Sequence, residues 1–193
     1  MSSTTKIFIF VCATALLLLN GASLFAQNYQ FTAQFGGSCS IGSPTAQDLK
    51  NYPDVSPNDL VPNGKTVTTS KSLGDGTGAF RQFNQLQSDG TFFINHGRFT
   101  FRFDEVILQG HYLGQTAPFN SALIGQYGVL VGDMGGPFIV TKIVAAKNAC
   151  TAPADLSSVC SKGTWTGTVQ LIPSPKPHCL LSLEFKSDGA ATQ

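Results

Sequence analysis

The chain has 193 residues, with 12 basic and 11 acidic side chains, so its formal net charge is only +1. Charged residues make up 12% of it, which is about half the share found in typical soluble domains. The sequence has no basic cluster, acidic tail or run of like charge, and such clusters are what bind nucleic acids and anionic membrane surfaces. Both are therefore poor candidate partners.

Residues 1–26 have the pattern of a cleaved signal peptide. Lys6 precedes an apolar run from Ile7 to Leu19, which is shorter than the ~20 residues that a membrane-spanning helix needs. Leu24-Phe25-Ala26 then fits a cleavage site. We expect export to the periplasm or the cell exterior, with residues 27–193 forming a single all-β domain without a transmembrane span. An uncleaved N-terminal anchor is the alternative.

Four cysteines follow the signal peptide. An even number in an exported chain favours two disulfides. No pair has C-x-x-C spacing and no histidine lies at zinc-ligand distance from a pair, so we expect neither a metal site nor a cofactor. Three pairings are possible. We favour Cys150–Cys160, the nearest pair in sequence, which leaves Cys39–Cys179.

The first predicted strand covers residues 29–35, where Tyr29, Phe31 and Phe35 fall on one face because successive side chains of a strand point to opposite sides. Residues 36–64 are rich in Pro and Asn and are predicted to form a long irregular loop. One helical turn can follow Ser43, which would cap it. Loops of this length are usually functional or disordered.

The clearest strand pattern lies at residues 99–103. Phe99, Phe101 and Phe103 occur at every second position, with Thr100 and Arg102 between them. An extended strand places the three rings on one face, whereas a helix would spread them around its circumference. This strand predicts an aromatic face that must be covered by other strands.

Several turns are predicted from Gly, Asn and Asp. Asp89-Gly90 is a strong hairpin signal. The other predicted turns and loops are Asn95-His96-Gly97, a loop at 110–121, a hairpin at 132–136 and a loop at 147–162.

The last two predicted strands, 164–171 and 179–186, alternate most regularly. In all, we expect eight to ten strands and no amphipathic helix after the signal peptide. Short turns between strands indicate antiparallel pairing. The sequence therefore predicts an all-β fold, a closed antiparallel β-barrel of about eight strands, which has no unpaired edges. A two-sheet β-sandwich is the alternative.

Two charged residues are candidates for the barrel interior. Glu105 has the same parity as Phe103, and Lys142 has the same parity as Val140. If both pointed inward, they would form a polar pair inside an apolar ligand pocket. The preferred interpretation is that a bulge near Asp104 turns both acids toward water, and parity does not orient Lys142, because its strand is apolar on both faces.

Three other residues are candidate ligand contacts. His111 and Tyr112 fall in the predicted loop at 110–121, and loops on a rigid barrel often contact ligands. Gly163-Thr164-Trp165 has the G-x-W form found near the start of lipocalin-like and avidin-like barrels, although here it lies near the chain end. We expect Trp165 to pack in the core or to close a barrel end, and we assign the chain to no family.

Three functions remain open. We expect foremost a disulfide-stabilised barrel that binds an apolar or sugar-like ligand without chemistry, because aromatic residues are abundant and no G-x-S-x-G, H-E-x-x-H or P-loop motif is present. The second is a cell-envelope or secreted component that contacts another protein through residues 36–64. The third is a small barrel enzyme of cyclase or hydrolase type that uses Glu105, His111 or Tyr112.

Overall fold

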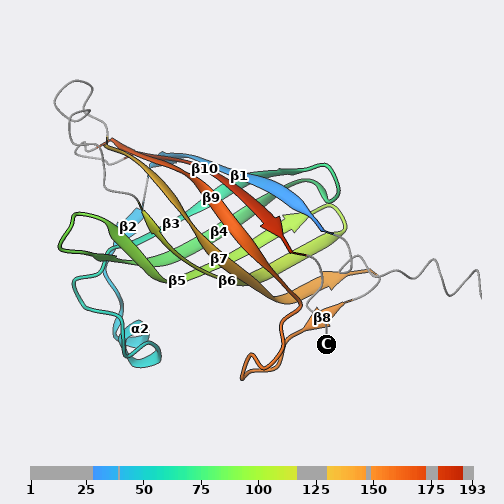
Figure 1. Cartoon of the computed structure of the whole chain (residues 1–193), viewed down its shortest axis with the longest axis horizontal. Helices are drawn as coiled ribbons and strands as arrows, with labels where there is room; N and C mark the ends of the chain where they lie inside the picture. The colour runs from blue at the N-terminus through green and yellow to red at the C-terminus, as the bar shows by residue number, and fades with distance from the viewer. Residues whose placement is uncertain (1–27, 39, 117–129, 147–148, 173–177, 189–193) are drawn as a thin grey trace, which may run out of the picture.

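The computed structural model describes residues 28–38, 40–116, 130–146, 149–172 and 178–188 (Figure 1). Most of these residues are in strands. The elements in chain order are β1 (Gln30–Ser38), β2 (Ser40–Gly42), α2 (Ala46–Asn51), β3 (Val61–Ser70), β4 (Gly74–Leu86), β5 (Phe92–Phe103), β6 (Val106–Thr116), β7 (Leu130–Ala145), β8 (Cys150–Thr151), β9 (Ser161–Ile172) and β10 (His178–Ser187).

Eight of the described strands close into an antiparallel barrel. From β3 to β10 the barrel strands follow one another in sequence, and β1 lies between β10 and β3. The pairing of Thr32 with Thr69 and of Gln34 with Val67 closes the ring. The short strands β2 and β8 pair with β3 and β7 beside the ring (Figure 1). The closed barrel is thus confirmed over the sandwich.

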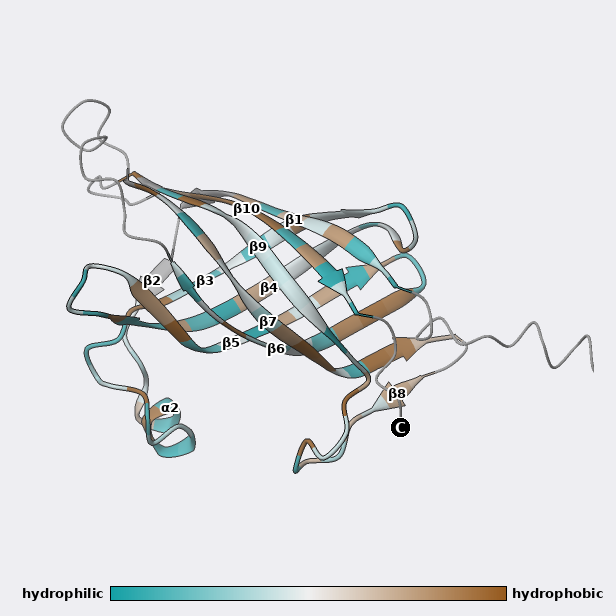
Figure 2. Cartoon of the chain, in the orientation of Figure 1, coloured by the Kyte–Doolittle hydropathy of each residue, from teal (hydrophilic) through white to brown (hydrophobic). Residues whose placement is uncertain are grey.

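Aromatic rings fill one half of the barrel interior. Phe99, Phe101 and Phe103 are all buried, as the period-two pattern predicts (Figure 2 shows the alternation along the strands). The ring of Phe185 on β10 stacks on that of Phe31 on β1, with centroids 4.8 Å apart. Centroid distances from Phe185 to the rings of Phe101, Phe138 and Trp165 are 5.2, 5.4 and 6.3 Å. This half of the interior is a packed core.

The predicted hairpin at 132–136 is wrong, because β7 runs through it without a turn. The glycines of this segment allow neighbouring strands to lie close to β7. Gly136 pairs with Trp165 on β9, and a Cβ at Gly136 would lie 2.2 Å from the carbonyl oxygen of Leu113 on β6. A side chain cannot fit there unless backbone moves, so the glycine is required by packing.

We expect Gly136→Ala to lower the free energy of unfolding by about 2 kcal/mol, the cost typical of an overpacked core. Gly42→Ala is the matched control, because a Cβ at Gly42 would meet nothing within 4 Å. Urea denaturation of both variants measures the difference. If Gly136→Ala is as stable as Gly42→Ala, the close approach of β6 to β7 is wrong.

Two other predicted turns also lie within strands. Asn95-His96-Gly97 is part of β5, where the register shifts between Ile94 and Gly97. The extra residues are thus accommodated as a bulge. A Cβ at Gly97 would lie 2.4 Å from the ring of Tyr112, so the glycine makes room for that ring. Residues 110–116 belong to β6, while the rest of the predicted loop lies outside the described residues.

The predicted loop at 36–64 is only partly irregular, because β1 extends to Ser38, β3 begins at Val61, and β2 and α2 lie between them. The predicted cap is also wrong by two residues, since Thr45 and not Ser43 caps α2. The Thr45 hydroxyl accepts a hydrogen bond from the Asp48 backbone N–H, and the Asp48 carboxylate accepts one from the Thr45 backbone N–H. This reciprocal capping box fixes the start of the helix.

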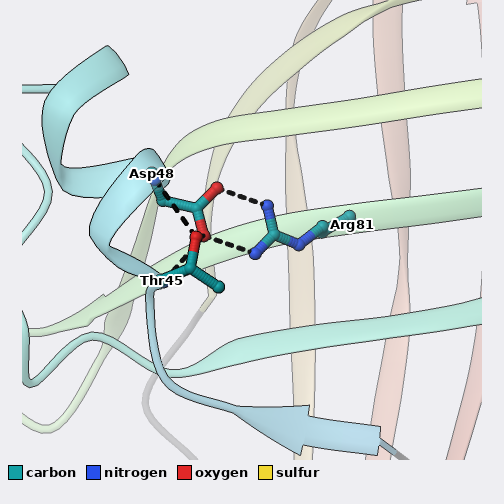
Figure 3. A network of polar contacts seen from close by, with 3 residues as sticks. All are labelled: Thr45, Asp48 and Arg81. Atoms are coloured by element: carbon teal, nitrogen blue, oxygen red, sulfur yellow. Dashed lines mark hydrogen bonds and ion pairs between the residues drawn. The ribbon is translucent and has the colours of Figure 1, made fainter.

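The segment around α2 is attached to the outer surface of the barrel. Asp48 accepts two hydrogen bonds of 2.7 Å from the guanidinium of Arg81 on β4 (Figure 3). Nearby, Leu49 and Tyr52 pack against a small apolar cluster that includes Phe83. Charge-assisted, bidentate bonds of this kind are among the stronger polar contacts in proteins.

We expect Asp48→Asn to lower the free energy of unfolding by about 2 kcal/mol at pH 7. The Arg81 side chain is 36% exposed, which keeps the loss below that of a fully buried pair. The Arg81 hydrogen bonds hold the pKa of Asp48 well below its usual range. A depressed pKa in the folded state stabilises the protein above the unfolded pKa of about 3.9, and that stability is lost as the pH falls.

The difference between wild type and Asp48→Asn should therefore be largest above pH 5 and shrink below pH 4. Urea midpoints across this range measure it. Asp75→Asn, at an exposed position on the same strand as Arg81, is the control. A difference that stays constant with pH would contradict the ionic character of the contact.

Candidate functional site

Neither Glu105 nor Lys142 points into the barrel. Glu105 is exposed with Asp104 in the short turn between β5 and β6, so both acids face water, as the preferred interpretation expected, although through a turn and not a bulge. Lys142 is exposed on β7 because the register shifts opposite Gln109. After the shift Ile143 takes the inward position. The alternative of an internal pair is wrong.

His111 and Tyr112 lie on opposite faces of β6. Tyr112 is buried inside the barrel, where its hydroxyl donates a 2.6 Å hydrogen bond to Oε1 of Gln82 on β4. Burial raises the pKa of Tyr112. His111 faces outward, and burial lowers its pKa, with further contributions from the positive charges of Arg98 and His96.

The residues named for an enzymatic role are therefore on three separate surfaces: Glu105 in a turn, His111 on the outer wall and Tyr112 in the interior. They do not form a common group. Among the residues that the structure describes, no three His, Cys, Asp or Glu side chains are placed to hold a metal ion.

Trp165 is a core residue. It is buried, and its indole N–H donates a 2.9 Å hydrogen bond to the carbonyl of Leu113 on β6. Its ring meets that of Tyr112 edge to face at 5.4 Å, and a Cβ at Gly114 would lie 2.5 Å from it. Trp165 therefore packs between the strands as expected, and it does not line the pocket described next.

An apolar pocket lies inside the barrel beyond the aromatic core, at the end where β4 leads into β5. Its cavity volume is about 80 Å³. The apolar part of its wall includes Phe80, Phe92, Met134, Val169 and Leu181. These residues come from five different strands, so no local stretch of sequence indicates the pocket.

One polar chain runs along the pocket wall. Gln82, which accepts the hydrogen bond from Tyr112, donates a 2.8 Å hydrogen bond from its amide to Oδ1 of Asn84. Both amides line the pocket. Gln82 was not predicted as a site residue from the sequence. The only indication of its inward position is that it has the same parity as Phe80 on the same strand. The pocket therefore combines apolar walls with side-chain amides, those of Gln82 and Asn84 among them.

Apolar side chains also lie exposed near this pocket. Leu60 is 41% exposed, pairs with Asn84 and lines the pocket. Leu86 is 64% exposed and pairs with Phe92, which also lines it. Exposed apolar surface next to a pocket is typical of a binding site for an apolar group.

The Cys150–Cys160 disulfide predicted from the sequence is present. Cys179 is also in a disulfide, and its predicted partner Cys39 lies outside the described residues, as does the predicted signal peptide at 1–26. No helix within the described ranges is both long and apolar enough to cross a membrane.

Comparison of the chain with protein-family models, with curated proteins and with solved structures finds no match. The function is therefore argued from the geometry of the pocket and of the barrel surface.

Proposed function

We propose that this chain is an exported, disulfide-stabilised β-barrel that binds a small apolar ligand without transforming it. The observation that carries the proposal is the apolar pocket bounded by Phe80, Met134 and Leu181, with the amides of Gln82 and Asn84 at its wall. Binding sites for small molecules are mostly apolar, with a few polar groups that fix orientation. Of the two ligand classes expected from sequence, this lining favours the apolar one over sugar.

The pocket volume limits the ligand. A cavity of 150 Å³ holds benzene, and this pocket has about half that volume, about 80 Å³. It therefore accepts a molecule of a few heavy atoms, or the apolar end of a longer one whose polar end meets Gln82 or Asn84. The exposed Leu60 and Leu86 extend the apolar surface that a longer ligand would contact.

Filling the pocket should abolish binding. We expect Val169→Phe, which places a ring in the pocket, to weaken binding of short-chain alcohols at least ten-fold, because the added ring occupies the ligand volume. Leu180→Phe is the matched control, since Leu180 is exposed on the neighbouring strand. Calorimetric titration measures ligand binding to both variants. Trp165 fluorescence gives a second signal, because Trp165 contacts Tyr112 and the Tyr112 hydroxyl is hydrogen-bonded to the pocket residue Gln82.

Leu181→Phe provides a second filling variant at a half-buried position of the same pocket, should Val169→Phe not fold. Equal ligand affinity in wild type and a folded filling variant would overturn the proposal. The absence of binding of any short-chain alcohol to the wild-type protein would do the same.

The two other functions named from the sequence stay predictions. The segment expected to contact another protein packs, in part, on its own barrel through Asp48 and Arg81. The residues expected to serve an enzyme are spread over three surfaces. Neither arrangement adds support to those functions.

A further inference from the structure

Five cationic side chains lie on one outer wall of the barrel, although no stretch of the sequence is basic. We call the outward positions of β3 to β7 that contain Lys65, Arg81, Arg98, Arg102 and Lys142 the basic wall. The whole chain has 12 basic residues, so a large share of its positive charge is on this one face. Four of the five side chains are exposed and Arg81 is half-buried.

Cross-strand pairing assembles the basic wall. Its central row, read from β3 to β7, is Lys65-Ala79-Thr100-Gln109-Lys142. In the row on one side of it, Arg98 on β5 lies directly opposite Arg81 on β4 and His111 on β6. In the row on the other side, Arg102 on β5 lies opposite Thr77 on β4. No Asp or Glu occupies any of these paired positions. Arg98 therefore has no carboxylate directly opposite it on either neighbouring strand.

Few of these charges are neutralised within the protein. Asp48 pairs with Arg81, but within the described ranges Lys65, Arg98, Arg102 and Lys142 form no ion pair. Arg98 is nevertheless held in place, because its guanidinium lies 4.9 Å from the centroid of the Tyr52 ring. Arg98 is thus oriented before any ligand arrives, which lowers the entropic cost of binding.

Two shallow hollows run along the basic wall. Their volumes are about 500 and 690 Å³, and they share Ala79, Thr100 and Gln109. Arg98 lines the first and Arg102 the second. A small side chain and two hydrogen-bonding groups therefore form the floor common to both hollows, with cations on either side of it. Such a surface suits an extended ligand with anionic groups and hydroxyls.

We propose that the basic wall binds an acidic polysaccharide. Arg98, Arg102 and the two lysines contact its carboxylate or sulfate groups, while Thr100 and Gln109 hydrogen-bond to its hydroxyls. Arginine matches both anions through its planar fork of donors. Single-stranded nucleic acid is the weaker match, because its bases stack on aromatic side chains, and the rings of Tyr52 and Phe83, which contact the wall, are already covered by Arg98 and Arg81.

The test measures binding of the purified protein to a sulfated glycan (heparin), a carboxylated glycan (polygalacturonate) and neutral dextran by calorimetry at several salt concentrations. We expect binding to at least one acidic glycan and none to dextran. Arg98→Gln/Arg102→Gln should weaken that binding at least ten-fold and reduce the slope of log Kd against log salt by about 1 or more, because fewer counterions are displaced. Lys50→Gln/Lys186→Gln, at exposed positions outside the wall, is the control.

Lys65→Gln/Lys142→Gln is a second variant, since neither lysine is in a described ion pair or ring contact, and it should weaken glycan binding in the same direction. The proposal fails if neither acidic glycan binds, or if both wall variants bind the glycan as tightly as the control variant does. It also fails if a single-stranded oligonucleotide or vesicles of anionic lipid, measured in the same way, bind while the acidic glycans do not. Val169→Phe, which fills the interior pocket, should leave glycan binding unchanged.

Discussion

Phe185→Ala should lower the free energy of unfolding by about 4 kcal/mol, the largest effect that we expect from any single substitution in this chain. Phe185 is buried in the aromatic half of the barrel, where its ring contacts those of Phe31, Phe101 and Phe138. Removing the ring loses its transfer free energy and leaves a cavity that closed strands on all sides cannot fill by collapsing. Urea or thermal denaturation measures the change.

Leu180→Ala is the control for this substitution, because Leu180 is on the same strand but 44% exposed. We expect it to change the free energy of unfolding by no more than about 0.5 kcal/mol. A Phe185→Ala protein as stable as Leu180→Ala would mean that the barrel interior is not packed at this position.

Cys150→Ala/Cys160→Ala should lower the free energy of unfolding by about 3 kcal/mol, because the disulfide closes a short loop and restricts the unfolded chain. The bridge also holds both ends of the loop against β7. Cys150 pairs with Ile143, and the Cys160 backbone N–H donates to the carbonyl of Val140. We therefore expect the loss to be accompanied by faster proteolysis within residues 151–159.

Ser158→Ala, an exposed position in the same loop, is the control for this double variant and should leave stability and proteolysis unchanged. The same midpoint of denaturation in the double variant and in wild type would show that the bridge contributes nothing to the native barrel. A non-reducing peptide map of wild type checks the pairing of Cys150 with Cys160 independently.

The all-β class and the barrel follow from the sequence because burial repeats every two residues along β1, β5, β9 and β10. Phe99, Phe101 and Phe103 show this most clearly. The turn predictions failed at Asn95–Gly97 and at 132–136, where glycines meet Tyr112 and Leu113 across neighbouring strands. A glycine needed for close approach and a glycine needed for a turn look the same in a single sequence.

The sequence predicts the pocket and the basic wall less well than it predicts the fold. Parity with Val140 left an inward Lys142 open as the less favoured alternative, and a one-residue bulge between the two residues reverses that parity. The pocket and the basic wall each combine residues from five or more strands, for example Phe80 with Leu181 and Lys65 with Arg98. Such groupings depend on register, which a bulge changes and a local pattern does not reveal.

The most direct test of the account is a crystal structure of the protein under xenon pressure, because xenon binds small dry apolar cavities. We predict xenon in the pocket, in contact with Phe80, Met134 and Leu181, and its loss in Val169→Phe. Xenon between Phe31 and Phe185, or no xenon in the pocket, would contradict a barrel that is packed in one half and hollow at one end.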